Sequence, residues 1–405
     1  MDTKYLIVGA GQAARRAAET LQQHAPSARI CMVGDEPDIP YDRPLLSKDV
    51  LRSVDAEAGV FINGHGYYAE NKVELRLGKR VAEIDRSRKT LHLNDGAAIA
   101  YDRLLLATGS RARPFPGPVS GQPKIYYLRT LADARRLRSA LHPGKRVVVL
   151  GGGFIGLEVA ASASVCGCDV AVIESAGRLL QRTMPAAVGA YMHDLHAARR
   201  VNILLDTVSH QVISHGADSA VVRTSKGDVP ADIVVVGIGA LPNVELAQHA
   251  QLSVNNGIVV DECCRTDDPD IFAAGDVTNH FNPLLGKHVR VESWQVAQNQ
   301  PVTAALNMLG GNAIYSELPW LWSDQYDCNL QTLGFFSEQH NLIRRKGVHA
   351  GAFSVLALDA DGRLQAATTV NSGRDMAVFK RLAASGQSLN ADALADSSVS
   401  LRALM

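Results

Sequence analysis

The sequence lacks an excess of charge of either sign. Its 405 residues include 41 Lys plus Arg and 41 Asp plus Glu, so the formal net charge is zero. A chain whose main partner is a nucleic acid or an anionic membrane is expected to be clearly basic. We therefore expect neither as a partner, although a local basic patch is compatible with this total.

Long apolar runs and a charged leader are also missing. No apolar stretch approaches the roughly 18 residues of a membrane-spanning helix, and the chain runs almost at once into the apolar segment 5–9. No cleavable signal pattern precedes that segment. These absences predict a cytoplasmic protein without a membrane anchor.

Cysteine is scarce, and its spacing matches neither a metal site nor a disulfide framework. The six cysteines are Cys31, Cys166, Cys168, Cys263, Cys264 and Cys328. They form no zinc-like double pair, and the 13 histidines show no ligand spacing, so we predict no metal. The C-x-C spacing of Cys166 and Cys168 favours buried structural thiols over a redox pair.

An internal repeat dominates what the sequence does contain. An apolar strand, a glycine-rich turn and a helix occupy residues 5–21, and the same pattern returns at residues 147–163. Each copy is followed by a second strand that ends near an acid, Asp35 in the first and Glu174 in the second. Alternating strands and helices predict parallel, doubly wound sheets. Two such units predict two nucleotide sites.

Apolar strands after the second copy indicate that it is inserted into the first. We predict an α/β fold with two Rossmann-like dinucleotide-binding domains and a C-terminal α+β domain. The expected boundaries are 1–110 and 236–315 for the first domain, 111–235 for the second and 316–405 for the C-terminal domain.

The first glycine motif fits G-x-G-x-x-G/A, with alanine at the third small position. Its named residues are Gly9, Gly11, Gln12, Ala13 and Ala14. It follows a strand and opens a helix, which is the context of a pyrophosphate site built on free helix N–H groups. Asp35 would accept hydrogen bonds from a ribose. The alternative is a tight strand–helix turn without a ligand, which this full context disfavours.

The second motif carries all three glycines. It consists of Gly151, Gly152, Gly153, Phe154, Ile155 and Gly156. Glu174 at its ribose position favours the 2′-hydroxyl of NADH and repels the 2′-phosphate of NADPH. Arg178 and Arg182 follow closely enough to leave NADPH open. A third motif, Gly275-Asp276 after an apolar strand, gains weight only in company with the other two.

With these motifs the chain resembles the FAD-dependent, NADH-oxidising ferredoxin reductases of bacterial Rieske dioxygenase and haem monooxygenase systems. The resemblance covers essentially the whole chain. It rests on the segments 40–48, 127–130, 152–158, 237–243, 291–294 and 322–326. The chain departs from the family pattern at Leu45, at Ala14 and at the pair Arg15-Arg16.

The resemblance implies roles for individual residues. Those implied at the FAD are Ala13, Asp35, Arg43, Lys48, Val81, Ala107, Thr108, Gly109, Arg129, Asp276, Glu292, Ser293 and Trp294. Those implied at the nicotinamide nucleotide are Gly151 to Gly156, Glu174, Gly237, Ile238 and Gly239. The alternative for Val81 and Trp294 is a simple core position.

The two residues implied as catalytic are Lys48 and Glu158. We expect them to pair near the flavin, because a buried lysine is costly without an anion and Glu158 lies two residues past Gly156. The alternative places Glu158 in solvent and Lys48 on a phosphate. For an acidic 2Fe–2S ferredoxin, the candidate docking residues are Lys287 and Arg290, with Arg344, Arg345 and Lys346 as second candidates. The alternative is a solvated charged turn without a docking role.

The implied function is transfer of electrons from NADH through FAD, one at a time, to a ferredoxin. The alternative on the same scaffold is an NADH oxidase, a peroxidase or a disulfide reductase. The absence of cysteine between Met32 and Val165 disfavours that alternative. A flavoprotein that acts by binding nucleic acid is disfavoured by the zero net charge.

Overall fold

The computed structural model describes residues 4–216 and 219–405, and the chain divides into two compact units. Unit 1 comprises Met1–Arg43, Ala58–Arg111 and Ala240–Pro319; unit 2 comprises Pro44–Glu57, Ala112–Gly239 and Trp320–Met405. Each unit contains one copy of the internal repeat. The predicted insertion of the second copy into the first is present, since unit 1 resumes after Gly239.

Unit 1 is built around a parallel sheet with the strand order β20-β7-β1-β2-β3. Its strands are β20 (Ile271–Ala273), β7 (Arg103–Leu106), β1 (Lys4–Val8), β2 (Arg29–Val33) and β3 (Val73–Arg76). Leu6, Ile7 and Val8 of β1 are all buried, as expected for a central strand covered on both faces.

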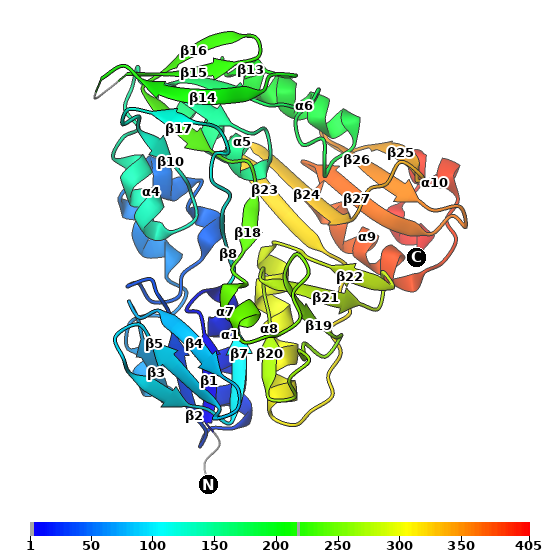
Figure 1. Ribbon diagram of the computed structural model, residues 1–405. Helices are drawn as coiled ribbons and strands as arrows, with labels where there is room; N and C mark the ends of the chain where they lie inside the picture. The colour runs from blue at the N-terminus through cyan, green and yellow to red at the C-terminus, as the bar shows by residue number, and fades with distance from the viewer. Residues whose placement is uncertain (1–3, 217–218) are drawn as a thin grey trace. The chain divides into compact units, whose positions relative to one another are not determined.

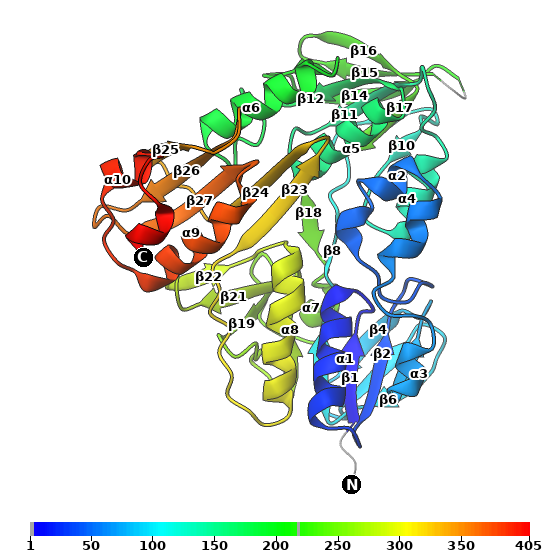
Figure 2. The ribbon, with the colours of Figure 1, turned by 180° about the vertical axis from the view of Figure 1, so that it is seen from behind.

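Helices α1 (Gln12–His24) and α8 (Trp294–Met308) lie side by side in this unit (Figure 2). Buried residues of α1 recur at helical spacing, at Ala14, Ala17, Ala18 and Leu21, so one face of the helix is committed to the core. The small side chains let α1 approach its neighbours closely.

Smaller elements complete unit 1. They are the antiparallel sheet β4 (Val81–Asp85), β5 (Thr90–Leu93) and β6 (Ala98–Ala100), the sheet β19 (Ile258–Val260), β21 (Thr278–Asn282) and β22 (Lys287–Val289), and helices α3 (Tyr67–Glu70) and α7 (Glu245–His249). Strands β8 (Ser110–Ala112) and β18 (Ala240–Pro242) form a two-stranded sheet.

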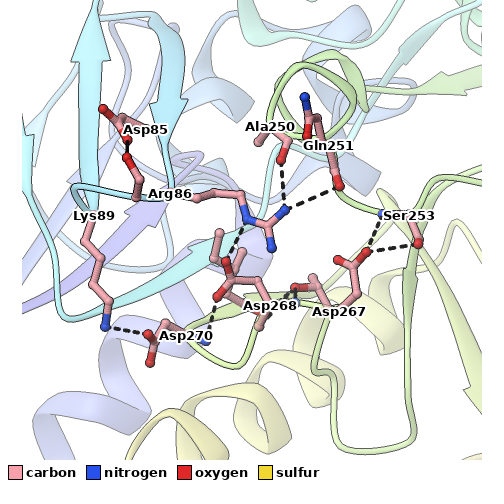
Figure 3. A network of polar contacts seen from close by, with 12 residues as sticks. Asp85, Arg86, Lys89, Ala250, Gln251, Ser253, Asp267, Asp268 and Asp270 are labelled. Atoms are coloured by element: carbon pink, nitrogen blue, oxygen red, sulfur yellow. Dashed lines mark hydrogen bonds and ion pairs between the residues drawn. The ribbon is translucent and has the colours of Figure 1, made fainter.

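A polar network ties the turn between β4 and β5 to the rest of unit 1 (Figure 3). The Arg86 guanidinium donates to Asp268 Oδ2 at 2.7 Å and to the carbonyl of Ala250 at 3.1 Å. Lys89 forms an ion pair with Asp270. These contacts join residues more than 160 positions apart in the sequence.

Unit 2 contains the second parallel sheet, with the order β10-β17-β11-β12-β13. Figure 1 labels β10, β17 and β13 of this sheet. Its strands are β10 (Ile125–Tyr126), β17 (Ile233–Val236), β11 (Arg146–Leu150), β12 (Asp169–Ile173) and β13 (Asn202–Leu204). The associated helices are α2 (Asp49–Arg52), α4 (Leu131–Arg138), α5 (Phe154–Val165) and α6 (Ala186–Ala197). A further sheet consists of β9 (Val119–Ser120), β14 (Ser209–Ser214), β15 (Ala220–Thr224) and β16 (Gly227–Ala231).

The C-terminal part of unit 2 is an antiparallel sheet packed against a helix. Its strand order is β23-β24-β27-β26-β25, from β23 (Trp320–Gln325), β24 (Cys328–Gly334), β27 (Leu364–Val370), β26 (Phe353–Leu358) and β25 (Asn341–Lys346). Helix α9 (Gly373–Ser385) packs on β24 and β27, and α10 (Ala391–Ala395) on β25. This is the α+β architecture expected from the sequence.

Candidate functional site

The first glycine motif lies at the carboxyl end of the sheet in unit 1. Gly9 has φ +121°, and a Cβ there would lie 2.2 Å from the carbonyl oxygen of Ala107, so only glycine fits. Gly11 is the N-cap of α1 and supplies no side-chain cap. The first-turn N–H groups of α1 are therefore available to an anion, as a pyrophosphate site requires.

Two more predicted residues converge on this turn. A Cβ on Gly275 would lie 3.0 Å from the Cβ of Ala13, so the Gly275-Asp276 loop passes directly beside the start of α1. The Asp276 carboxylate accepts a hydrogen bond from Ser110 Oγ at 3.2 Å. The first glycine motif and the Gly275-Asp276 motif therefore lie next to each other within unit 1.

Arg43 lies on the same side of unit 1. Its guanidinium donates to Glu36 Oε1 at 2.6 Å and to the Tyr41 hydroxyl at 2.9 Å, and Tyr41 in turn donates to Glu36. Burial opposes the charge of Arg43, but Tyr41 and Glu36 raise the pKa of the guanidinium above its usual value. A permanently charged group is therefore held close to Gly11, whose Cβ would lie 3.8 Å from Arg43 Nη2.

Asp35 occupies a different backbone position from Glu174. Gly9 donates its N–H to the carbonyl of Val33, and Gly151 donates to that of Ile173, so Gly34 and not Asp35 is equivalent to Glu174. The Asp35 side chain is 62% exposed and lies 3.5 Å from Arg80. Its contact with a ribose stays a prediction.

The remaining predicted FAD residues of unit 1 are held by contacts within that unit. Thr108 and Asn243 exchange two hydrogen bonds of 2.8 Å, which fix the turn that contains Ala107 and Gly109. The Trp294 indole donates to Asp42 Oδ1 at 2.7 Å. Ser293 caps α8, accepting from the N–H of Val296, and Glu292 pairs with Arg290. Val81 is buried in an apolar cluster.

Gln12 and Arg15 form a polar cluster between α1 and α8 that no sequence motif indicates. The buried Arg15 donates to Gln12 at 3.2 Å and to Gln298 at 3.0 Å, and it pairs with Glu19. Gln12 also donates to Gln298. The Arg15-Arg16 departure from the family pattern therefore ties α1 to α8.

The second motif has the same geometry in unit 2. Gly151 has φ +104° and lies against Gly237, where a Cβ would approach the carbonyl oxygen to 2.5 Å. A Cβ on Gly156 would lie 2.1 Å from the carbonyl oxygen of Gly151, while one on Gly153 would meet nothing within 4 Å. The open Gly153 position, the N-cap of α5, fits close approach by a phosphate.

Glu174 is fixed at the end of β12. Its Oε2 accepts from the N–H of Gly152 at 2.7 Å, and its Oε1 accepts from that of Ala176 at 2.8 Å. Arg178 donates to the carbonyls of Met184 and Gln181, so this cation is committed to its own loop.

Arg182 differs from Arg178 in what it approaches. Its Nη2 lies 4.0 Å from the position of a Cβ on Gly239, beside Arg113. Arg182 is therefore close to the predicted nucleotide loop 237–239.

Lys48 and Glu158 form the predicted pair. Lys48 Nζ lies 2.9 Å from Glu158 Oε2, and the two side chains are 11% and 4% exposed. Ser47 also donates to Glu158 Oε2, and Ser323 donates to Oε1 at 2.6 Å. The pairing is confirmed, and its place at a flavin stays a prediction. The backbone N–H of Arg129, another predicted flavin residue of unit 2, donates to Asp133.

The thiols are not poised for redox chemistry. All six cysteines are free, and burial raises the pKa of Cys31, Cys168 and Cys328 to about 11. The pKa of the fully buried Cys264 lies well above its usual value for the same reason. These thiols are protonated at neutral pH and do not supply the thiolate that disulfide exchange needs.

One docking candidate is wrong. Arg345 is buried and donates to the carbonyls of Leu394, Asp396 and Val399, so it is a structural cation of the C-terminal sheet. The alternation along β25 that buries Arg345 exposes Arg344, which lies over the ring of Phe353.

Within 4–216 and 219–405, no group of three His, Cys, Asp or Glu side chains could hold a metal ion. In that same part of the chain, no helix combines the length and apolarity needed to cross a membrane.

Comparison with known families identifies the family to which the chain belongs. Residues 3–301 match the model of the pyridine nucleotide-disulphide oxidoreductases, and residues 320–405 match the reductase C-terminal family. The chain belongs to the pyridine nucleotide-disulphide oxidoreductase family. Members of this family use FAD and NAD(H), and the two glycine cradles fit those two dinucleotides. The chain is thus an oxidoreductase with the predicted fold of two Rossmann domains and a C-terminal domain.

Individual relatives cover the whole chain. The ferredoxin–NAD(+) reductase component of the anthranilate 1,2-dioxygenase system of Burkholderia cepacia is 53% identical over 401 residues, 99% of each chain. The structure of a ferredoxin reductase from Rhodopseudomonas palustris matches with a TM-score of 0.95 at 35% identity and 100% coverage of both chains. A covalent putidaredoxin reductase–putidaredoxin complex matches with a TM-score of 0.93 at 36% identity, covering 99% of this chain and 98% of that one.

Proposed function

We propose that this protein is an NADH-dependent ferredoxin reductase that passes electrons from NADH through FAD, one at a time, to a 2Fe–2S ferredoxin serving an oxygenase. The observation that carries the proposal is two glycine-cradled dinucleotide folds in one chain whose thiols are held protonated. The names of the Burkholderia relative and of the putidaredoxin complex support ferredoxin as the acceptor.

The residues of each unit have separate tasks in this proposal. In unit 1, the α1 N-terminus and Arg43 bind the FAD pyrophosphate, while Asp276 orients the sugar chain. In unit 2, the α5 N-terminus and Glu174 bind NADH. FAD, when bound, accepts a hydride from NADH and releases electrons singly. Lys48 supplies a positive charge beside the ring system, and Glu158 holds that lysine.

Three further assignments belong to the proposal. The domain boundaries are those drawn from the sequence, with FAD in the first domain and NADH in the second, except that the segment Pro44–Glu57 is assigned to unit 2. The other assigned FAD residues, including Val81, Arg129 and Trp294, contact FAD, and the loop 237–239 contacts NADH. The protein acts in the cytoplasm, because a reductase that consumes NADH must lie where NADH is regenerated.

Acceptor specificity tests the function. The FAD-loaded protein should be yellow and should oxidise NADH rapidly with a 2Fe–2S ferredoxin, and at least about tenfold more slowly with oxygen, peroxide or a disulfide. Folded protein that takes up no FAD would refute the proposal. Equal turnover with a disulfide would favour the disulfide reductase alternative.

A further inference from the structure

A chain of buried hydrogen bonds runs from Glu158 into the C-terminal sheet. Ser323 Oγ donates to Glu158 Oε1 at 2.6 Å, Gln325 Nε2 donates to Ser323 Oγ at 3.0 Å, and Gln325 Oε1 lies 2.8 Å from His196 Nε2. All four side chains are at most 4% exposed. They belong to unit 2 but come from three elements, α5, β23 and α6.

The chemistry of Glu158 determines the direction of every bond in this chain. An ionised carboxylate only accepts, so the Ser323 hydroxyl must donate its single hydrogen to Glu158. The Ser323 oxygen can then only accept, which assigns the Gln325 amide nitrogen as its donor. Gln325 Oε1 must in turn accept, and His196 carries its proton on Nε2.

The surroundings of His196 agree with this assignment. Burial lowers the pKa of His196, and nearby Arg199 lowers it further, against the opposing hydrogen bond to Gln325. The neutral ring leaves Nδ1 as an acceptor, and the Tyr326 hydroxyl lies 3.4 Å from it. The chain therefore ends at a histidine that is held neutral in one tautomer.

The donors divide between the two carboxylate oxygens. Lys48 and Ser47 contact Oε2, whereas Ser323 donates to Oε1. With both oxygens bound, the carboxylate plane cannot rotate, and Lys48 is held against one oxygen. Loss of the hydrogen bond from Ser323 leaves Glu158 Oε1, an oxygen of a buried carboxylate, without a donor. An unsatisfied buried charge is costly, so the Lys48–Glu158 pair would rearrange.

We propose that Ser323 is a positioning residue for the Lys48–Glu158 pair, and that Gln325 and His196 hold Ser323 in its donating orientation. The inference rests on the proposed function, in which Lys48 lies beside the flavin. The chain fixes geometry and does not conduct protons, because the amide of Gln325 donates and accepts without titrating. The C-terminal domain thereby contributes to hydride transfer.

Stopped-flow reduction of the FAD-loaded enzyme by NADH, without ferredoxin, tests the inference. Ser323→Ala should slow flavin reduction about tenfold, the effect of one hydrogen bond to a charged group, and leave the NADH dissociation constant unchanged. Ser323→Thr should restore the rate. In a Glu158→Gln background, Ser323→Ala should have no further effect.

The matched control is Ser354→Ala in the same sheet. Ser354 is equally buried, and its hydroxyl has no hydrogen-bond partner among the described residues. Gln325→Met should slow reduction in the same direction by a smaller factor, and it carries the test if Ser323→Ala fails to fold. Rates that match the Ser354→Ala control would overturn the inference.

A second readout does not depend on activity. In ¹⁵N-histidine spectra, the His196 ring should show the Nε2–H tautomer in the wild type, and Gln325→Met should shift that signal. A different tautomer in the wild type would overturn the assigned bond directions. Failure of the wild type to reduce its flavin with NADH would instead refute the proposed function.

Discussion

At the scale of single residues, the two copies of the repeat differ at two facing positions. The first copy has a methyl group facing a glycine, and the second has a glycine facing a carboxylate. Ala10 and Gly152 are equivalent, as are Gly34 and Glu174. A Cβ on Gly34 would lie 2.4 Å from the Cβ of Ala10, whereas Gly152 leaves room for the Glu174 carboxylate to accept its N–H. The methyl of Ala10 therefore excludes an acid at position 34, and the first copy places its acid at Asp35.

This difference gives Glu174 a testable part in cofactor choice. Glu174→Gln keeps one acceptor oxygen but removes the charge that repels a 2′-phosphate. We expect the ratio of kcat/KM for NADPH to that for NADH to rise at least about tenfold. Asp206→Asn, which neutralises an exposed acid close to Gly177, should leave the ratio unchanged. An unchanged ratio in Glu174→Gln would show that Glu174 does not face the ribose.

His280 makes the fold sensitive to acid. Burial, and to a lesser extent His288, lower the pKa of His280 from 6.5 to about 4. Between those values the unfolded chain binds a proton that the folded chain does not, so stability falls as pH falls through this window. The loss from pH 7 to pH 5 should be about 2 kcal/mol.

His280→Phe should remove that loss. Neither ring nitrogen of His280 has a hydrogen-bond partner in the described part of the chain, and its ring packs edge-on against Tyr315, a contact that phenylalanine can keep. Urea unfolding at pH 7 and pH 5 measures the effect. The exposed His249→Gln serves as the control. An equal acid sensitivity of His280→Phe and the wild type would contradict the assignment.

At the scale of elements, the β4–β5 turn depends on the contacts of Arg86 (Figure 3). Arg86→Met keeps the aliphatic stem but removes the donors to Asp268 and to the carbonyl of Ala250. We expect a loss of about 1–2 kcal/mol in the free energy of unfolding, measured with urea. Arg88→Met is the control, because Arg88 is 82% exposed and lies 3.7 Å from Asp85. Equal losses in both variants would mean that the network adds no stability.

Elements whose pattern is local were predictable from the sequence, and contacts between distant elements were not. Both strand–glycine–helix units followed from motif spacing, whereas the Lys48–Glu158 pair, which joins distant segments, was expected only because of the family resemblance. Ser323 could not be found as a partner of Glu158, because 165 positions separate them and a serine in a strand carries no signal of its own. The role of Arg345 was missed because a cation normally indicates a surface, whereas here three backbone carbonyls in α10 and just after it accept hydrogen bonds from the guanidinium.

At the scale of the whole molecule, a net charge of zero limits how a ferredoxin can be attracted. No long-range field of one sign steers an acidic partner, so association must use local cations. The burial of Arg345 leaves Lys287, Arg290, Arg344 and Lys346, and Arg290 already pairs with Glu292. In unit 1, Lys287 of β22 is the preferred candidate, because its side chain is exposed.

Charge reversal at Lys287 tests this docking hypothesis. Lys287→Glu should slow ferredoxin reduction several-fold at low ionic strength, and the difference from the wild type should shrink at physiological salt, where the Debye length is about 8 Å. Reduction of the flavin by NADH should not change, because only the encounter with the protein partner is affected. Lys226→Glu, an exposed reversal in unit 2, controls for the change in net charge. If the rate of ferredoxin reduction by the wild type does not change with salt, electrostatic docking is ruled out, because salt screens the attraction between exposed charges.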